Sequence, residues 1–167
     1  MHIMTVCLGN ICRSPAAEAV LIDRLEQAGL DHVTVSSAGT ADYHVGSQPH
    51  ELSRAEGEAR GYRFQAVGAQ FTAADFESAD LILVMDESNG EDVRALARNA
   101  GERAKVVPMG AFASDAADTG ARAVPDPYGH PRKAFAAMYD QLEEAVDGLV
   151  AALQDGTVGQ IVQRHAV

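Results

Sequence analysis

The residues best suited to chemistry lie near the start of the chain, in Cys7-Leu8-Gly9-Asn10-Ile11-Cys12-Arg13-Ser14-Pro15. A thiolate at Cys7 is a nucleophile, and the five residues before Arg13 can curl so that their backbone N–H groups point at one anion. The guanidinium of Arg13 can bind two phosphate oxygens at once. Ser14 and Pro15 fit the N-cap and first position of a helix, whose positive end favours both the anion and a thiolate. The pattern predicts a site in which Cys7 attacks phosphate.

A cysteine and an arginine at this spacing also occur together by chance. The sequence around them makes this motif more specific. A short apolar run precedes it and a helical pattern follows it, as a phosphate-binding turn requires. The alternative is a structural cysteine beside an unrelated arginine, and a cysteine in apolar surroundings would be inert. The residues expected to bind phosphate are Leu8, Gly9, Asn10, Ile11, Cys12, Arg13 and Ser14.

A cysteine that attacks a phosphate monoester needs an acid to protonate the departing oxygen. The best candidate is Asp126, because Pro125 and Pro127 stiffen the backbone on both sides and restrict where its carboxyl points. The alternative is an ordinary turn without a catalytic role. Asp115 and Asp118 are competing acids, but they lie in a polar loop that has no residue to hold them in place.

The composition of the whole chain narrows the class of protein. Its 167 residues fit one domain with a substantial core, and a net charge of −11 argues against nucleic acid or an anionic membrane surface as the main partner. No apolar stretch approaches a membrane span, and no signal peptide is visible. With only two cysteines, a cytoplasmic location is the default, although signal-independent export stays open. The six histidines are scattered, so no metal site is expected.

Apolar runs alternate with helical patterns, which predicts an α/β fold with a parallel sheet and covering helices. The clearest element is a C-terminal helix, because apolar residues recur at helical spacing from Phe135 to Leu153. A further helix is expected to bury Val93, Leu96 and Ala97. Strands are expected at residues 3–7, 32–37, 81–85 and 105–107, and helices at 15–28, 50–60, 87–100 and up to 153.

The predicted order of strands and helices also predicts where the chemistry lies. In open α/β sheets, ligands bind at the carboxyl ends of the strands. Residues 7–14, 37–46 and 85–88 each follow a predicted strand, and residues 124–131 precede the last helix. All four segments can therefore meet around one crevice. Residues 1–155 are expected to form the domain and 156–167 a frayed tail, with an ordered interface segment as the alternative.

Four segments carry a family resemblance: Cys7 to Pro15, Ser37-Ala38-Gly39-Thr40, Met85-Asp86-Glu87-Ser88-Asn89 and Asp126-Pro127-Tyr128. In this order they resemble the low-molecular-weight protein tyrosine phosphatases, over about residues 3–153. The resemblance implies a four-stranded parallel sheet with helices on both faces and a phosphate-binding loop between the first strand and the first helix. It also implies hydrolysis of phosphotyrosine in proteins, and of small aryl phosphates, through a phosphocysteine intermediate without metal or cofactor.

Carried over by position, the resemblance implies a catalytic role for each of four residues. Cys7 would be the nucleophile and Arg13 the clamp for phosphate and the transition state. Asp126 would be the general acid and then the base that activates water. Ser14 would hydrogen-bond the Cys7 sulfur and make it a better leaving group.

The resemblance also implies supporting residues and the walls of a substrate pocket. Asn10 and Ser37 would hold the loop in shape through side-chain hydrogen bonds. Tyr43 and Tyr128 would stand on opposite sides of a phosphotyrosine ring. The alternative is that both tyrosines are merely exposed loop residues. Cys12 matches a position used as a redox guard, where a Cys7–Cys12 disulfide spares Cys7 from over-oxidation; otherwise Cys12 is a small buried residue.

Two departures from the family pattern bear on activity. Residues 66–70, Ala-Val-Gly-Ala-Gln, stand where the family often has a histidine that supports the loop, so the loop is expected to be less rigid. Tyr128 is followed by Gly129 and His130, where many relatives have a second tyrosine. The rim of the pocket is therefore expected to be thinner on that side.

Two other functions fit the sequence less well than a phosphatase does. A thioredoxin-coupled arsenate reductase needs cysteines downstream to pass on a disulfide, and none follows Cys12. A non-catalytic phosphate-binding module would not need Asp126 or Ser14. The expected partners are phosphotyrosine-containing proteins, the expected state is a monomer or weak homodimer, and the arginine-rich, lysine-poor composition is associated with a bacterial source.

Overall fold

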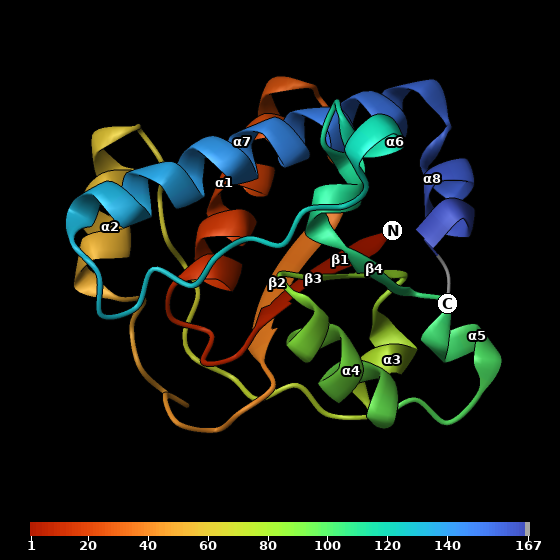
Figure 1. Ribbon diagram of the computed structural model, residues 1–167, viewed down its shortest axis with the longest axis horizontal. Coiled ribbons are helices and arrows are strands. Elements are labelled where there is room, and N and C mark those ends of the chain that lie inside the picture. Colours follow the sequence, from red (N-terminus) through yellow and green to blue (C-terminus); the bar gives the residue numbers. More distant parts are fainter. Residues whose placement is uncertain (166–167) are drawn as a thin grey trace.

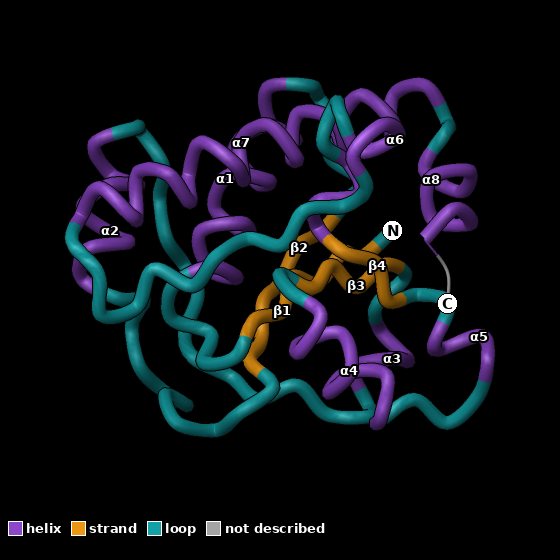
Figure 2. The backbone as a smooth tube through the Cα atoms, in the orientation of Figure 1, coloured by secondary structure: helices purple, strands orange, loops and turns teal. Residues whose placement is uncertain are grey.

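The computed structural model of the chain describes residues 1–165 and has a four-stranded, all-parallel sheet at its centre (Figure 2). The strand order is β2-β1-β3-β4, so the chain starts in the middle of the sheet and builds outward on both sides. The register of β1 against β2 runs from His2 opposite Thr34 to Cys7 opposite Gly39. The strands are β1 (His2–Cys7), β2 (Thr34–Gly39), β3 (Leu81–Val84) and β4 (Val106–Pro108).

Helices cover both faces of the sheet, as the family resemblance implies (Figure 1). One face is covered by α1 (Arg13–Gln27) and α7 (Arg132–Asp155), with α2 (Glu51–Ala59) beside them. The other face is covered by α3 (Asp75–Ser78) and α4 (Glu87–Ala95), with α5 (Ala100–Arg103) next to them. The remaining elements are η1 (Met109–Phe112), α6 (Ala116–Thr119) and α8 (Val158–His165). Within residues 1–165 no helix combines the length and apolar character that a membrane span requires.

Strand β3 shows why the sheet is sandwiched between helices. Alternate side chains of a strand point to opposite faces of a sheet. Leu81 and Leu83 accordingly join the core beneath α1 and α7, whereas Ile82 and Val84 join the smaller core beneath α4. All four are buried, which explains why this strand reads as an unbroken apolar run.

The observed bounds of two elements differ from the predicted ones in a way that concerns the site. The second strand runs from Thr34 to Gly39 instead of 32–37, because the pairing with β1 begins at Thr34. Helix α1 begins at Arg13 with Cys12 at the N-cap, so the expectation that Ser14 caps the helix and Pro15 takes its first position is wrong. The Ser14 side chain is instead directed into the loop network described below.

The helix predicted at 87–100 is shorter than expected. It ends at Ala95, and a separate turn, α5, begins after Asn99, whose side chain accepts a hydrogen bond from the backbone N–H of Glu102. Val93 is buried as predicted, but Leu96 caps the end of α4 and is 43% exposed. The prediction that Leu96 faces the core is therefore wrong.

The end of the chain is more ordered than the prediction of a frayed tail. Helix α7 ends at Asp155, and Gly156 follows it with a left-handed φ of 71° before the chain turns into α8. Val158, Ile161 and Val162 pack against the main core, and this contact fixes the short helix. Residues 166–167 of the predicted tail lie outside the described residues.

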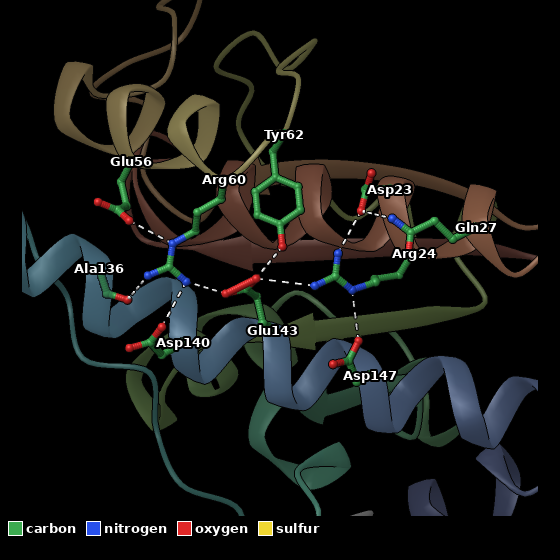
Figure 3. Close-up of polar contacts among 10 residues, drawn as sticks. All are labelled: Asp23, Arg24, Gln27, Glu56, Arg60, Tyr62, Ala136, Asp140, Glu143 and Asp147. Carbon is green, nitrogen blue, oxygen red and sulfur yellow. Dashed lines mark hydrogen bonds and ion pairs between the residues drawn. The ribbon is translucent and has the colours of Figure 1, made fainter.

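A polar network holds α2 and the segment after it against α7 (Figure 3). Glu143 of α7 stands between Arg24 of α1 and Arg60 at the end of α2, and it pairs with both. Tyr62 donates a 2.5 Å hydrogen bond to the same carboxylate, and burial raises the pKa of Tyr62 to about 12, so the hydroxyl keeps its proton at neutral pH. Arg60 also binds the Ala136 carbonyl. This network fixes the position of α2, which supports the site.

Candidate active site

The predicted nucleophile, clamp and acid line one cavity of about 310 Å³ at the carboxyl ends of the strands. Cys7 is the last residue of β1, and Arg13 begins α1, so the loop between them turns around the entrance of the helix. Asp126 comes from the loop before α7, more than a hundred residues away in sequence. The cavity is lined by Cys7, Leu8, Gly9, Ile11, Cys12, Arg13, Tyr43, His44, Asp126 and Tyr128.

Asn10 shapes the loop from beneath. Its φ of 56° is left-handed, a conformation that asparagine tolerates better than most residues. Its side-chain N–H₂ donates to Ser14 Oγ at 2.8 Å and to Ser37 Oγ at 3.0 Å, and its side-chain oxygen accepts from the Ala69 N–H at 3.0 Å. The buried amide therefore ties the loop to helix α1, to strand β2 and to the segment before α3.

The sulfur of Cys7 lies 3.1 Å from Ser14 Oγ, within hydrogen-bonding distance. Ser14 is buried and its Oγ accepts a hydrogen bond from Asn10, while its single proton is shared between two acceptors, the Cys7 sulfur and the Ala38 carbonyl, which lies 3.2 Å from Ser14 Oγ. When Cys7 is a thiolate, the Ser14 hydroxyl is the only one of the two groups that carries a proton to donate. Ser14 can therefore stabilise negative charge on the sulfur.

The guanidinium of Arg13 is buried and held on one side. Its Nη1 donates to Asp86 at 2.6 Å and to the Val124 carbonyl at 3.0 Å, and its Nη2 lies 3.7 Å from the Asp126 carboxylate. Its Nε–H has no hydrogen-bond partner among residues 1–165. The anchored Nη1 fixes the plane of the group, and the Nε and Nη2 donors remain available for two oxygens of a phosphate.

The segment that directly follows strand β2 holds the first part of the loop. The N–H groups of Thr40 and Ala41 donate to the carbonyls of Cys7 and Leu8, each at 2.9 Å. In a trans peptide the carbonyl and the next N–H point in opposite directions, so a carbonyl held outward turns the following N–H inward. The approach is so close that a Cβ on Gly39 would lie 2.7 Å from the Leu8 oxygen. Only glycine fits there.

Helix α2 holds the last part of the loop in the same way. The His50 N–H donates to the Ile11 carbonyl at 2.8 Å, and Ser53 Oγ donates to the Cys12 carbonyl at 3.3 Å. The hydroxyl of Tyr139 in α7 donates to the Ser53 carbonyl at 2.8 Å and fixes that turn of the helix. Both Ser53 and Tyr139 are fully buried.

The segment at 66–70 still supports the loop, although the histidine common in the family is missing. The backbone of Ala69 provides the contact, since its N–H binds Asn10 and its carbonyl accepts from the Gly39 N–H at 2.8 Å. Gly68 allows this path, because a Cβ there would lie 2.0 Å from the His44 carbonyl. Main-chain hydrogen bonds thus take part of the place of a side chain.

Two buried ionisable groups lie next to the loop. Burial, together with the negative charges of Asp126 and Cys7, raises the pKa of the Cys12 thiol to about 12, although the positive charge of Arg13 acts in the opposite direction. Cys12 is therefore a neutral thiol at pH 7. Burial also raises the pKa of Glu18 to about 7, and Ser37 partly offsets this shift. Glu18 is consequently only partly ionised at neutral pH and opposes a thiolate less than a full carboxylate would.

The two predicted wall residues stand at the mouth of the cavity. Tyr43 is 72% exposed and Tyr128 is 56% exposed. Tyr128 packs edge-on against His50 at 5.7 Å between ring centres, and His50 in turn stacks on Phe135 at 5.0 Å. The Tyr128 N–H also donates to Asp126 at 3.1 Å, which couples this wall to the acid.

Three supporting residues received no role from the sequence. Asp86 pairs with Arg13, and its side chain also caps α4 by accepting a hydrogen bond from the Asn89 N–H. The sequence feature that could have indicated Asp86 is its position just after a buried strand. Ser53 and His50 donate hydrogen bonds to carbonyls of the loop from a helix about forty residues downstream. No local sequence pattern predicts such contacts. The competing acids Asp115 and Asp118 do not line the cavity.

Replacing Ser53 with alanine is expected to weaken anion binding. The change removes one of the hydrogen bonds that keep the Cys12 carbonyl outward and the Arg13 N–H inward. A buried hydrogen bond contributes about 0.5–1.5 kcal/mol, so the inhibition constant for inorganic phosphate should rise roughly 2- to 12-fold. Competitive inhibition of aryl phosphate hydrolysis measures this constant directly.

Ser114→Ala is the matched control, because it removes a hydroxyl from an exposed serine that bonds only Glu144 among the described residues. The control should leave the inhibition constant for phosphate as in the wild type. If Ser53→Ala lowers the melting temperature but leaves that constant within two-fold, Ser53 supports α2 alone and does not orient the loop.

Comparison with known proteins agrees with the geometry. The family model described as low molecular weight phosphotyrosine protein phosphatase matches residues 2–158. A low molecular weight protein-tyrosine-phosphatase from Streptomyces coelicolor is 36% identical, over 93% of this chain and 94% of that protein. A protein tyrosine phosphatase from Entamoeba histolytica, solved with Hepes in its active site, is 34% identical with a TM-score of 0.88, covering 95% of this chain and 99% of the other.

A further solved structure contains a bound ligand of interest. Wzb from Vibrio vulnificus, solved in complex with benzylphosphonate, is 28% identical with a TM-score of 0.77. The alignment covers 90% of this chain and 97% of Wzb. The similarity thus extends over nearly the whole length of both chains and includes the sheet and the helices that position the cavity.

Proposed function

This chain belongs to the low molecular weight phosphotyrosine protein phosphatase family, and we propose that Cys7, Arg13 and Asp126 carry out its reaction. The enzyme hydrolyses phosphotyrosine in proteins through a phosphocysteine intermediate and without a metal ion. The observation that supports the assignment is that these three side chains, far apart in sequence, line the same cavity. Arg13 is anchored there with donors left for phosphate.

In the first step, phosphate is held by the inward N–H groups of the loop and by Arg13. The Cys7 thiolate attacks phosphorus and forms the P–S bond, while the bond from phosphorus to the tyrosine oxygen breaks. The electron pair goes to that oxygen, and Asp126 in its protonated form donates the proton that makes it a neutral phenol. Arg13 stabilises the charge on the phosphoryl oxygens in the transition state.

In the second step, water attacks the phosphocysteine. Asp126, now a carboxylate, accepts a proton from this water, and the new P–O bond forms as the P–S bond breaks. Cys7 leaves as a thiolate, and the Ser14 hydroxyl at 3.1 Å stabilises the negative sulfur by donating a hydrogen bond. Both steps use the same acid–base group and the same anion-binding loop.

The walls of the cavity suit an aromatic ring above the phosphate. Tyr43 and Tyr128 both line the mouth, and an aromatic pair contributes about 0.5–1.5 kcal/mol beyond the burial of its area. The benzylphosphonate bound to the Vibrio vulnificus relative supports this choice of ligand. Phosphotyrosine-containing proteins are therefore the proposed partners, with small aryl phosphates as additional substrates.

Several further properties are proposed from the sequence. Residues 1–155 form the phosphatase domain, and residues 156–167 are an addition to it. We infer a cytoplasmic bacterial enzyme, a monomer or weak homodimer, that binds neither nucleic acid nor membranes. The net charge of −11 supports the last point, because polyanions would be repelled.

Acid quenching during turnover tests the assignment of the nucleophile. The reduced protein should hydrolyse p-nitrophenyl phosphate at mildly acidic to neutral pH at a rate that EDTA leaves unchanged. Peptide mapping of the quenched enzyme should find the phosphoryl group on Cys7. No turnover by the folded, reduced protein, or a phosphoryl group on another residue, would contradict the proposal.

Peroxide is expected to inactivate the enzyme reversibly through a Cys7–Cys12 disulfide. Hydrogen peroxide oxidises the Cys7 thiolate to a sulfenic acid, and Cys12 then attacks this sulfur, forms the S–S bond and releases water. Only the thiolate of Cys12 attacks, and its pKa is about 12. After a short peroxide pulse stopped with catalase, the rate of disulfide formation should therefore rise about tenfold per pH unit between pH 6 and 9.

Cys12→Ser separates the guard role from simple burial. The variant lacks the second sulfur, so peroxide should drive Cys7 on to sulfinic acid and the activity regained with a thiol reductant should be small. Mass spectrometry distinguishes the disulfide from the higher oxides. If Cys12→Ser recovers as fully as the wild type, Cys12 is not a guard.

A further inference from the structure

A second hollow of about 560 Å³ lies beside the active-site cavity, between the loop after β2 and helix α4. Phe71, which is buried, forms part of its base, and the exposed side chains of Leu8, Tyr43 and Leu96 stand around it. The chain exposes few large apolar residues, so three of them around one hollow mark it as a surface for binding.

This hollow lies next to the catalytic cavity. Leu8 and Tyr43 line both, so their side chains form the ridge between the two. A peptide whose phosphotyrosine reaches Cys7 must leave the cavity over its rim. Since an extended chain advances roughly 3.3–3.6 Å per residue, a residue one or two positions away from the phosphotyrosine reaches the neighbouring hollow.

The walls of the hollow select the kind of residue that fits. Asp92 of α4 is its one charged lining residue within the described part of the chain, and the other walls are apolar or neutral. A lysine or arginine has an apolar stem for Leu8 and Leu96 and a cationic end for Asp92. A glutamate in the same place would meet the carboxylate of Asp92 on a protein of net charge −11.

We propose that this hollow is a substrate subsite that binds a basic residue next to the phosphotyrosine of a protein substrate. Asp92 and Leu96 are then specificity-determining residues, because they contact the flanking residue and not the phosphate. The inference rests on the proposed function and names the class of phosphotyrosine segment that the enzyme prefers.

Phosphotyrosine peptides test the subsite, with lysine, leucine or glutamate placed one or two residues before or after the phosphotyrosine. p-Nitrophenyl phosphate, which fills only the cavity over Cys7, is the reference substrate. For each variant, the kcat/KM of every peptide is divided by the kcat/KM of p-nitrophenyl phosphate. An exposed ion pair changes affinity up to about five-fold, so the wild type should favour lysine over glutamate about three-fold or more at one of these positions in low salt.

Asp92→Lys should remove or reverse this preference, and Leu96→Ser should lower the rates for the lysine and leucine peptides together. Glu91→Lys is the matched control, because it makes the same change of charge on the adjacent exposed residue of α4, which does not line the hollow. Val67→Ser is the apolar control, being an exposed side chain away from this site. Both controls should keep the wild-type preference.

Two results would overturn the subsite. One is equal rates for lysine and glutamate peptides in the wild type at every position, and the other is an equal loss of preference in Asp92→Lys and Glu91→Lys. The latter would mean that the overall charge of the protein, and not this hollow, sets the preference. Failure of the proposed function would look different, because the wild type would then not hydrolyse p-nitrophenyl phosphate at all.

Discussion

Cys7→Ser is expected to abolish turnover while phosphate still binds. A serine hydroxyl is not ionised near neutral pH, so the variant has no nucleophile for phosphorus. Removing the covalent nucleophile of a serine protease costs about 10⁶-fold in kcat. The loop N–H groups and Arg13 remain in place, because their positions depend on Thr40, Asp86 and the other contacts of the loop. Hydrolysis of p-nitrophenyl phosphate and calorimetric titration with phosphate measure the two properties separately.

Cys12→Ser is the matched control, since it exchanges sulfur for oxygen in the same loop. The Cys12 sulfur forms no bond to phosphorus in the proposed mechanism. The decrease in kcat caused by Cys12→Ser should therefore be far smaller than that caused by Cys7→Ser. A Cys7→Ser enzyme that retained substantial turnover would mean that another group attacks. Loss of phosphate binding in the same variant would mean that the sulfur also shapes the loop.

The fold was predictable where one local pattern determines an element. The Leu81–Val84 strand is apolar throughout because helices cover both of its faces, and α7 is long enough to show its apolar stripe over many turns. The break after Ala95 was not predictable from the periodicity of Val93, Leu96 and Ala97. It depends on Asn99, which starts a new turn, and Leu96 lines the second hollow instead of the core.

The site was predictable where its residues are neighbours in the sequence. The loop from Cys7 to Ser14 is contiguous in sequence, and its backbone, Asn10 and Ser14 form a local unit that the motif encodes. Asp86, His50 and Ser53 reach the loop only through tertiary folding, and they hold it by contacts whose partners are 39 to 73 residues away. A single sequence contains no spacing rule for such contacts.

The missing histidine shows which supporting contacts a comparison of side chains leaves out. Its absence predicts a looser loop, yet Ala69 provides a backbone donor to Asn10 and a carbonyl to Gly39. A backbone group can serve here because Gly68 lets the chain pass against His44. The prediction of reduced rigidity concerned a side chain, and the supporting contacts come from main-chain atoms that any residue possesses.

Asp126→Ala is expected to lower kcat for phosphotyrosine by about 10²- to 10⁴-fold, the usual contribution of general acid–base catalysis. Without the carboxyl, the tyrosine oxygen leaves as an anion and no base activates water in the second step. The loss should be smaller for p-nitrophenyl phosphate than for phosphotyrosine, because p-nitrophenolate is stable without a proton. Initial rates at low substrate concentration give kcat/KM for both substrates, which includes only the steps up to the loss of the phenol and therefore measures this difference.

Asp115→Ala is the matched control for this change, because it removes a carboxylate that pairs with Arg122 and does not line the cavity. It should leave both rates near wild type. Asp126→Asn adds a further comparison, since it keeps the size of the side chain and its position 3.7 Å from Arg13 but cannot transfer the proton. If Asp126→Asn is nearly as active as the wild type, the carboxyl serves only to position Arg13 and Tyr128, and another group must be the acid.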